Sequence, residues 1–453
     1  MPKVKSQFVC SSCGYTSPRW LGNCPQCKSW NCFDEVLPES VESSAHRAKF
    51  ETNAGAIKPL KLDEIDPALT VRYETGMPEF DRVLGGGLVS GSLILLGGDP
   101  GIGKSTIALQ LASKRSDLNV LYCSGEESDG QIKQRASRMQ VNSDKLYIYT
   151  ETDISKIQAQ VEKNKPDILI IDSIQTVFRP ELQSMPGTVA QIRECAGLLM
   201  RLAKQMNVIT IVIGHVTKEG DLAGPRVLEH MVDVVLQFEG DKSLNYRMLR
   251  TLKNRFGRTH EIGVFEMLEA GLRDVINPSE LFLSEFSEGV SGNAAVCVME
   301  GNRPIILEIQ ALVTPSLYGT PQRTSSGFDS RRLSLLLAVL EKRAGFRFGD
   351  KDVFLNVAGG MKVQDTASDL AVVTALVSSL IDKPIPEKTL LIGEVGLGAE
   401  IRTVNGLDQR VREAEKVGFR KIITPASRSK KGTSHAEARF LRDVFSMLFK
   451  SGN

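Results

Sequence analysis

The segment LILLGGDPGIGKST, from Leu93 to Thr106, indicates the type of fold more clearly than any other part of the sequence. Its first residues are apolar and suit a short buried strand, and residues 98–106 fit the pattern G-x4-G-K-S/T. Glycines in such a loop let backbone N–H groups turn inward around phosphates, and the helix that starts there adds the positive end of its dipole. The sequence therefore predicts a nucleotide-binding P-loop that takes ATP and Mg²⁺.

Each residue of this loop has an expected role. Lys104 is expected to reach the β- and γ-phosphates, the Ser105 hydroxyl to bind Mg²⁺, and Thr106 to begin the helix behind the loop. An accidental glycine-rich loop is the alternative. The residues expected to surround the nucleotide are Gly98, Asp99, Pro100, Gly101, Ile102, Gly103, Lys104, Ser105 and Thr106.

Strand-like and helix-like segments alternate around the P-loop. Such alternation predicts an α/β domain with a mainly parallel sheet covered by helices on both faces. Two later strands, near 232–238 and 245–252, have no helix between them and are expected as an antiparallel extension. The other expected strands are 93–96, 120–123, 146–149, 168–171 and 208–213, and the expected helices are 104–114, 128–139, 154–163 and 189–206.

Two acidic positions follow predicted strands of this domain. Asp172 ends the apolar run 168–171, which is the Walker B pattern, and is expected to hold the Mg²⁺ shell. Glu126 follows the strand after the P-loop and is the candidate general base, with Glu127 as the second choice. We expect that strand to lie beside the P-loop strand. The alternative is that Asp172 caps a turn and both glutamates only cap the next helix.

Four cysteines near the N-terminus have the spacing of a metal site. Cys10, Cys13, Cys24 and Cys27 form two C-x2-C pairs separated by ten residues. Two such turns can hold one tetrahedral Zn²⁺, and four protein ligands leave no open position for catalysis. A redox dithiol or a disulfide is the alternative, but a redox C-x-x-C normally starts a helix after a strand. Cys32 lies outside the spacing and is expected to be a spare thiol.

Both tryptophans of the chain lie in this cysteine-rich head. Trp20 and Trp30, with Arg19 and Lys28, would suit a contact surface for nucleic acid or protein. The simpler reading is that the tryptophans pack the small ribbon, and that is what we expect.

Length and composition indicate a globular protein of several domains. The chain has 453 residues, of which 42% are hydrophobic, and a net charge of +2. The expected organisation is a zinc-binding head at 1–36, a linker at 37–58, an ATPase domain at 59–270 and a second α/β domain at 271–453. Apolar runs fall short of the roughly 18 residues of a membrane span. The N-terminus lacks a secretory signal pattern, so we expect a cytoplasmic protein with no membrane partner.

Several motifs together resemble a known family. The run TGMPEFDRVLGGG at 75–87, the P-loop and SGEES at 124–128 resemble the RecA-like ATPases. The four-cysteine head and KNRFG at 253–257 narrow the resemblance to the RadA (Sms) family of bacterial DNA repair proteins, over essentially the whole chain.

The resemblance implies a DNA-stimulated ATPase that acts in recombination. It implies a homo-hexameric ring that moves on single-stranded DNA, branch-migrates recombination intermediates and contacts a RecA-type recombinase. Segment 215–227 matches the family's DNA-facing loop. His215 would then sense the γ-phosphate, or would simply be a polar residue at a strand end.

A basic segment without acidic residues surrounds KNRFG. Lys253 and Arg255 are expected near the sheet edge, where a cation of one ring subunit can reach its neighbour's γ-phosphate. The alternatives are a DNA-backbone contact and a solvated strand edge. The basic residues of the segment are Lys242, Arg247, Arg250, Lys253, Arg255 and Arg258.

The C-terminal half resembles the proteolytic domain of Lon. LLIGEVGLGAEIR at 390–402 and TALVS at 374–378 carry that likeness. The positions of the Lon serine and lysine fall on Ala367 and Asp408, and Ser368 is one residue away. We therefore expect a ring scaffold without protease activity.

Two other functions remain as alternatives. A nucleotide-driven regulatory ring, similar to the circadian-clock ATPases that share this core, would explain the P-loop but not the zinc head. A Lon-type protease would need the serine–lysine pair that the aligned positions lack.

Overall fold

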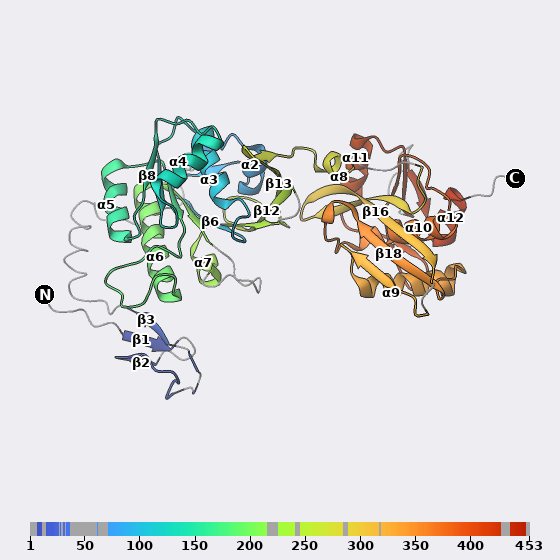
Figure 1. Ribbon diagram of the computed structural model, residues 1–453, viewed down its shortest axis with the longest axis horizontal. Helices are drawn as coiled ribbons and strands as arrows, with labels where there is room; N and C mark the ends of the chain where they lie inside the picture. The colour runs from blue at the N-terminus through green and yellow to red at the C-terminus, as the bar shows by residue number, and fades with distance from the viewer. Residues whose placement is uncertain are drawn as a thin grey trace. The chain divides into compact units, whose positions relative to one another are not determined.

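The computed structural model divides the chain into two compact units, residues 1–274 and 275–453 (Figure 1). The first unit ends after Asp274 rather than at 270, because strand β14 (Gly271–Asp274) pairs with β13 (Ile262–Leu268). The structure describes residues 7–10, 15–26, 28, 30–31, 33–36, 61, 71–214, 225–240, 245–283, 289–316, 319–426 and 435–449. The expected linker and several named residues, Cys13, Cys27, Cys32, His215 and Lys242, lie outside these ranges.

A nine-stranded sheet forms the centre of the first unit. Its order is β14-β13-β12-β11-β6-β10-β9-β7-β8. The pairs from β8 through to β11 are parallel, so the prediction of a mainly parallel sheet is confirmed. The strands not yet given are β6 (Leu93–Gly97), β7 (Val120–Ser124), β8 (Leu146–Tyr149), β9 (Ile168–Asp172), β10 (Ile209–Ile213), β11 (Val234–Glu239) and β12 (Tyr246–Asn254).

The expected antiparallel extension needs one correction. β11 pairs with β12 in antiparallel fashion, as predicted, but it pairs with β6 in parallel. The helix α7 (Pro225–Met231) brings the chain back across the sheet before β11 begins, which allows the parallel pairing. The extension therefore starts at β12. The sequence did not reveal α7, because its apolar pattern is short.

Helices cover both faces of this sheet (Figure 1). Along β6, Ile94 and Leu96 belong to one apolar core, and Leu93 and Leu95 belong to the other. The first core includes α2 (Pro78–Leu84), α3 (Lys104–Lys114) and α4 (Asp129–Arg138). The second includes α5 (Ile154–Asn164), α6 (Val189–Met206) and α7. A short pair, β4 (Arg72–Tyr73) and β5 (Leu88–Val89), precedes β6.

The N-terminal head is a small ribbon of three strands. β1 (Gln7–Cys10) pairs with β2 (Thr16–Ser17) and β3 (Phe33–Val36). The side chains of Trp20 and Trp30 are 51% and 75% exposed. The expectation that they pack the ribbon is therefore wrong. The ribbon core is made instead of Cys10, Cys24 and Phe33, with Phe8 and Leu21 against them.

The second unit is α/β, as predicted. Its seven-stranded sheet has the order β17-β18-β16-β15-β19-β22-β23. The strands are β15 (Asn293–Glu300), β16 (Arg303–Pro315), β17 (Arg323–Ser326), β18 (Lys351–Val357), β19 (Thr389–Leu391), β22 (Lys421–Pro425) and β23 (His435–Ala438), with β20 (Glu394–Val395) pairing β21 (Ile401–Arg402). The helices are α8 (Pro278–Leu283), α9 (Ser330–Val339), α10 (Asp369–Leu380), α11 (Leu407–Val417) and α12 (Leu441–Leu448).

Helix α9 continues through a π-helical turn at Leu340–Ala344, and a 3-10 turn at Thr366–Ser368 leads into α10. None of the helices in the described parts of either unit is long and apolar enough to cross a membrane.

Candidate nucleotide site

The P-loop joins the end of β6 to the start of α3. Gly98 has φ +144°, and a Cβ added there would lie 2.9 Å from the Cβ of Phe238. Gly103 has φ +120°, and its added Cβ would lie 3.0 Å from the Met267 methyl group. Only glycine suits either position, since the backbone is left-handed and the neighbouring strands leave no room. Ile102 is buried under the loop, while Asp99, Pro100 and Gly101 are exposed on its outer side.

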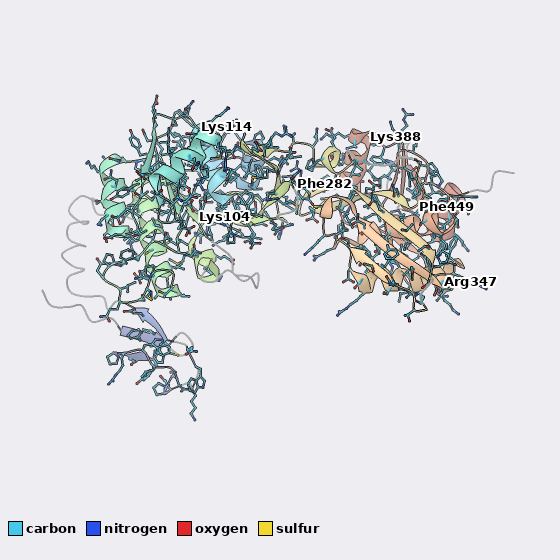
Figure 2. The ribbon with its side chains drawn as sticks, viewed as in Figure 1. Lys104, Lys114, Phe282, Arg347, Lys388 and Phe449 are labelled. Carbon is cyan, nitrogen blue, oxygen red and sulfur yellow. The ribbon has the colours of Figure 1, made fainter. Side chains whose placement is uncertain are left out.

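Lys104 is the first residue of α3 and is only 3% exposed (Figure 2). Its Nζ donates hydrogen bonds to the carbonyl oxygens of Gly98, at 2.7 Å, and Asp99, at 2.9 Å. Burial lowers the pKa of Lys104 to about 8, although Asp172, Glu126 and Asp99 act in the opposite direction. A buried cation at the N-terminus of a helix fits the phosphates of a nucleotide. Ser105 and Thr106 follow in the first turn of α3, both half-buried.

Asp172 is the last residue of β9 and is 5% exposed. The hydroxyl of Tyr122, on the neighbouring strand β7, donates a hydrogen bond to its Oδ2. Tyr122 is fully buried, and burial and the charge of Asp172 hold its pKa well above the usual value. The peptide bond from Asp172 to Ser173 is cis. A carboxylate near Lys104 at the ends of parallel strands fits a Mg²⁺ shell.

Glu126 reaches the same site by a different route from the one expected. The expectation that its strand lies beside the P-loop strand is wrong, because β10 and β9 separate β6 from β7. The loop after β7 turns toward β9 instead: Gly125 N–H donates to the Asp172 carbonyl at 2.9 Å. Ser173 Oγ then donates to Glu126 Oε1. Glu126 is close enough to Lys104 to affect its pKa.

Glu127, the second candidate base, binds Arg135 and not the residues around Asp172. Its Oε1 accepts a hydrogen bond of 2.8 Å from Arg135 Nη1 on α4. Neither glutamate caps that helix, because Ser128 is its N-cap and its Oγ accepts from Gln131 N–H. The capping alternative is therefore wrong, and the two glutamates differ in position: one beside Asp172, the other tied to α4.

The KNRFG segment, residues 253–257, lies inside the first unit and not at an edge of its sheet. Two strands, β13 and β14, lie outside β12, so the expected sheet-edge position is wrong, and so is the reading as a solvated edge strand. β12 has neighbours on both sides because the chain continues outward in two more hairpin-connected strands. Asn254 Nδ2 donates to the Leu84 carbonyl at 3.0 Å, and a Cβ on Gly257 would lie 3.0 Å from Gly85 Cα.

Both cations of that segment have partners within the chain. Lys253 Nζ donates to the carbonyl oxygens of Glu229 (2.6 Å) and Val232 (2.8 Å), around the end of α7. Arg255 Nη1 lies 3.3 Å from Asp233 Oδ1, and its side chain is 58% exposed. Burial and the neighbouring Arg255 lower the pKa of Lys253. Within the basic segment, Arg250 pairs with Glu239 and Arg247 is buried.

The predicted zinc ligands fall in two groups. Cys10 and Cys24 are buried together in the ribbon core, and Lys28 N–H closes the turn after Cys24 by donating to its carbonyl at 2.8 Å. Buried thiols in a core this small are typical of a structural zinc ribbon, which metal binding stabilises. The other two predicted ligands lie outside the described residues.

The aligned Lon positions are filled differently. Ala367 and Ser368 are both fully buried, and Ser368 Oγ donates to the Asp365 carbonyl at 2.7 Å. Asp408 is exposed in the first turn of α11. Arg410, two residues further along α11, is buried and pairs with Asp365 Oδ2 at 2.6 Å. Of the two aligned positions, Ala367 is therefore packed in the core and Asp408 lies at the surface.

Sequence reasoning missed three residues that shape the nucleotide site: Tyr122, Arg135 and Ser173. Tyr122 and Ser173 contact carboxylates that are 50 and 47 residues away in the chain, and Arg135 contacts Glu127 from α4. No local motif marks these contacts. Only the adjacency of Ser173 to Asp172 in the chain offered a signal.

Comparisons with known proteins agree with this architecture. Family models match at residues 59–221 (AAA domain), 8–35 (Rubredoxin metal binding domain) and 318–428 (Subunit ChlI of Mg-chelatase). The chain is 48% identical over 427 residues to the DNA repair protein RadA of Halalkalibacterium halodurans, covering 94% of this chain and 93% of that protein. It is 48% identical to the RadA of Bacillus subtilis, with 94% of each covered, and 49% identical to that of Listeria monocytogenes, with 94% and 93% covered. Identity at this level over nearly the whole length of both proteins shows that the chain belongs to the DNA repair protein RadA family.

Proposed function

We propose that this protein is a DNA-stimulated ATPase of recombinational DNA repair that works in the cytoplasm. In this proposal a homo-hexameric ring hydrolyses ATP to move on single-stranded DNA and to branch-migrate recombination intermediates. The observation that carries it is the convergence of Lys104, Asp172 and Glu126 at one end of the parallel sheet, in a chain of the RadA family. A buried cation and two carboxylates are the groups that phosphoryl transfer to water requires.

Each residue has a role in this proposal. Lys104 exchanges its hydrogen bonds with the loop carbonyls for bonds to the β- and γ-phosphates. Ser105 and Asp172 hold Mg²⁺, which neutralises phosphate charge when bound. Glu126 accepts a proton from the attacking water, and Ser173 keeps its carboxylate oriented. The ion pair of Glu127 with Arg135 favours Glu126 over Glu127 for this role.

Lys253 and Arg255, the cations of the KNRFG segment, are suited to act on the nucleotide of a neighbouring subunit. In the single chain Lys253 binds the end of α7 and Arg255 binds Asp233, and α7 begins within segment 215–227, which we expect to face DNA. We propose that assembly of the ring releases these cations from their partners and lets them reach the nucleotide of the neighbouring subunit, which would couple hydrolysis between subunits.

The cysteine-rich head and the second unit also have roles in this proposal. Cys10, Cys13, Cys24 and Cys27 hold a structural Zn²⁺, and the exposed tryptophans of that head suit a contact with DNA or with a RecA-type recombinase. The second unit serves as a scaffold of the ring without protease activity, since Ser368 is buried and Asp408 stands where a lysine base would be needed.

The experiment that tests the proposal is the processing of a synthetic branched DNA. We expect the junction to move with ATP, and to stay in place with a non-hydrolysable ATP analogue or with the Lys104→Ala variant. The alternative, a regulatory ring, predicts ATP hydrolysis with no movement of the junction under any condition. Degradation of casein with ATP, lost in Ser368→Ala, would instead support a protease.

A further inference from the structure

Tyr122 has a position that packing alone does not require. Its side chain lies in the apolar core beneath α3 and α4, where it is fully buried. A phenylalanine would fill almost the same volume without burying a hydroxyl, which is costly unless it is hydrogen-bonded. The hydroxyl has such a bond, and its acceptor is Asp172 Oδ2. The strand register explains the reach, because β7 and β9 are neighbours with Ser124 paired to Asp172.

A second contact joins this hydroxyl to α4. Arg135 Nη2 lies 3.4 Å from the Tyr122 oxygen, while its Nη1 binds Glu127 at 2.8 Å. The hydroxyl therefore accepts from a guanidinium and donates to a carboxylate. A cation on the oxygen of a donor strengthens the bond that the donor makes. Asp172 is in this way connected to Arg135 through Tyr122.

We propose that Tyr122 is a positioning residue for the magnesium carboxylate, and that Arg135 acts through it. The hydroxyl occupies one oxygen of Asp172 and fixes the plane of the carboxylate, so that the other oxygen is directed to the Mg²⁺ shell. Mg²⁺ demands near-ideal octahedral geometry, so a rotated carboxylate weakens its binding. This inference rests on the proposed ATPase function and names a residue that tunes its metal site.

The test is the Tyr122→Phe variant, which removes only the hydroxyl. We expect the Mg²⁺ concentration for half-maximal ATPase to rise about tenfold, as for the loss of one charge-assisted hydrogen bond. A second readout does not need turnover: binding of Mn²⁺ to the ADP-bound protein, followed by electron paramagnetic resonance, should weaken by a similar factor. ADP affinity in EDTA and the melting temperature should stay close to those of the unmutated protein.

Two further variants sharpen the test. Tyr149→Phe, on the neighbouring strand β8, removes a tyrosine hydroxyl away from Asp172 and should leave the Mg²⁺ requirement unchanged. Arg135→Gln should raise the Mg²⁺ requirement in the unmutated background by a smaller factor. In the Tyr122→Phe background it should add nothing, because its effect passes through the hydroxyl.

Three outcomes would overturn the inference. Tyr122→Phe with an unchanged Mg²⁺ requirement and Mn²⁺ affinity shows that the tyrosine only fills space. Equal loss of ADP affinity in EDTA shows a general structural defect. Additive effects of Arg135→Gln and Tyr122→Phe show that Arg135 acts by another route. An unmutated protein that hydrolyses no ATP would contradict the proposed function instead, and the Mn²⁺ measurement would still decide the role of Tyr122.

Discussion

Ser173 and Glu126 follow different strands, β9 and β7, yet the Ser173 hydroxyl donates a hydrogen bond to the Glu126 carboxylate. Ser173 directly follows Asp172, so this contact brings the proposed general base beside the proposed magnesium ligand. It does so although two strands separate β7 from the P-loop strand. The pair distinguishes Glu126 from Glu127, whose carboxylate binds Arg135.

Glu126→Gln is expected to lower ATP turnover by about 10²–10⁴, the usual contribution of a general base. The amide keeps the shape of the side chain but cannot accept a proton from water, so ATP binding should persist. The matched control is Glu127→Gln, which should retain turnover within several-fold. Steady-state ATPase and nucleotide binding measure both. If the two variants exchanged these results, Glu127 would be the base.

Nucleotide affinity is expected to depend on pH through Lys104. Its pKa is lowered to about 8 in the free protein, and phosphates favour the charged form, so binding takes up a proton above that pH. The nucleotide Kd should therefore stay flat below about pH 8 and rise by up to tenfold per pH unit above it. Kd measured at pH 7.5 and 9.5 tests this. Lys104→Ala should bind weakly at both, and a parallel rise in that variant would contradict the assignment.

The same shift has an opposite consequence for folding. Because the pKa of Lys104 in the folded chain lies below its unfolded value, burial of the charged lysine destabilises the nucleotide-free protein below about pH 8. That penalty is relieved as the pH rises toward 10.5, where the unfolded lysine also loses its proton.

Cys10→Ser is expected to release zinc from the head. Cys10 is buried in a core too small to fold without a metal, and three thiolates bind Zn²⁺ more weakly than four. The control is Cys32→Ser, which lies outside the ligand spacing and should retain one zinc per chain. Metal analysis measures the zinc content of both variants. One zinc per chain in Cys10→Ser would argue against the four-thiolate site. ATPase without DNA should survive in each.

Arg255→Ala is expected to lower ATPase even without DNA, by about the 10³–10⁵ of an arginine finger. Asp233 keeps Lys204 at 2.8 Å and Leu93 N–H at 3.0 Å, so the fold should tolerate the change. Arg258→Ala, exposed in the same basic segment, is the control and should affect only DNA binding and its salt dependence.

Mixing subunits tests whether Arg255 acts on a neighbour. Rings that combine Arg255→Ala with Lys104→Ala subunits contain interfaces with both an intact P-loop and an intact finger. Some activity should therefore return on mixing. Mixed rings that stay inactive, with Arg255→Ala defective only in DNA binding, would show that the residue contacts phosphates of DNA alone.

Most helices and strands of the ATPase domain could be predicted from local sequence patterns. The apolar runs predicted the central strands within a residue or two, and the P-loop spacing placed Lys104 at the start of α3. Strand order could not be read in the same way, because it depends on which distant segments pair. The position of Glu126 was misjudged for that reason. The exposure of Trp30 was missed because Cys10, Cys24 and Phe33, rather than the tryptophan rings, form the centre of the ribbon.

Steady-state ATP hydrolysis with and without single-stranded DNA tests the proposed ATPase most directly. We expect slow turnover without DNA, a several-fold or greater increase with single-stranded DNA, and almost no turnover in Lys104→Ala under either condition. Turnover that is indifferent to DNA in the unmutated protein, or that persists in Lys104→Ala, would contradict it.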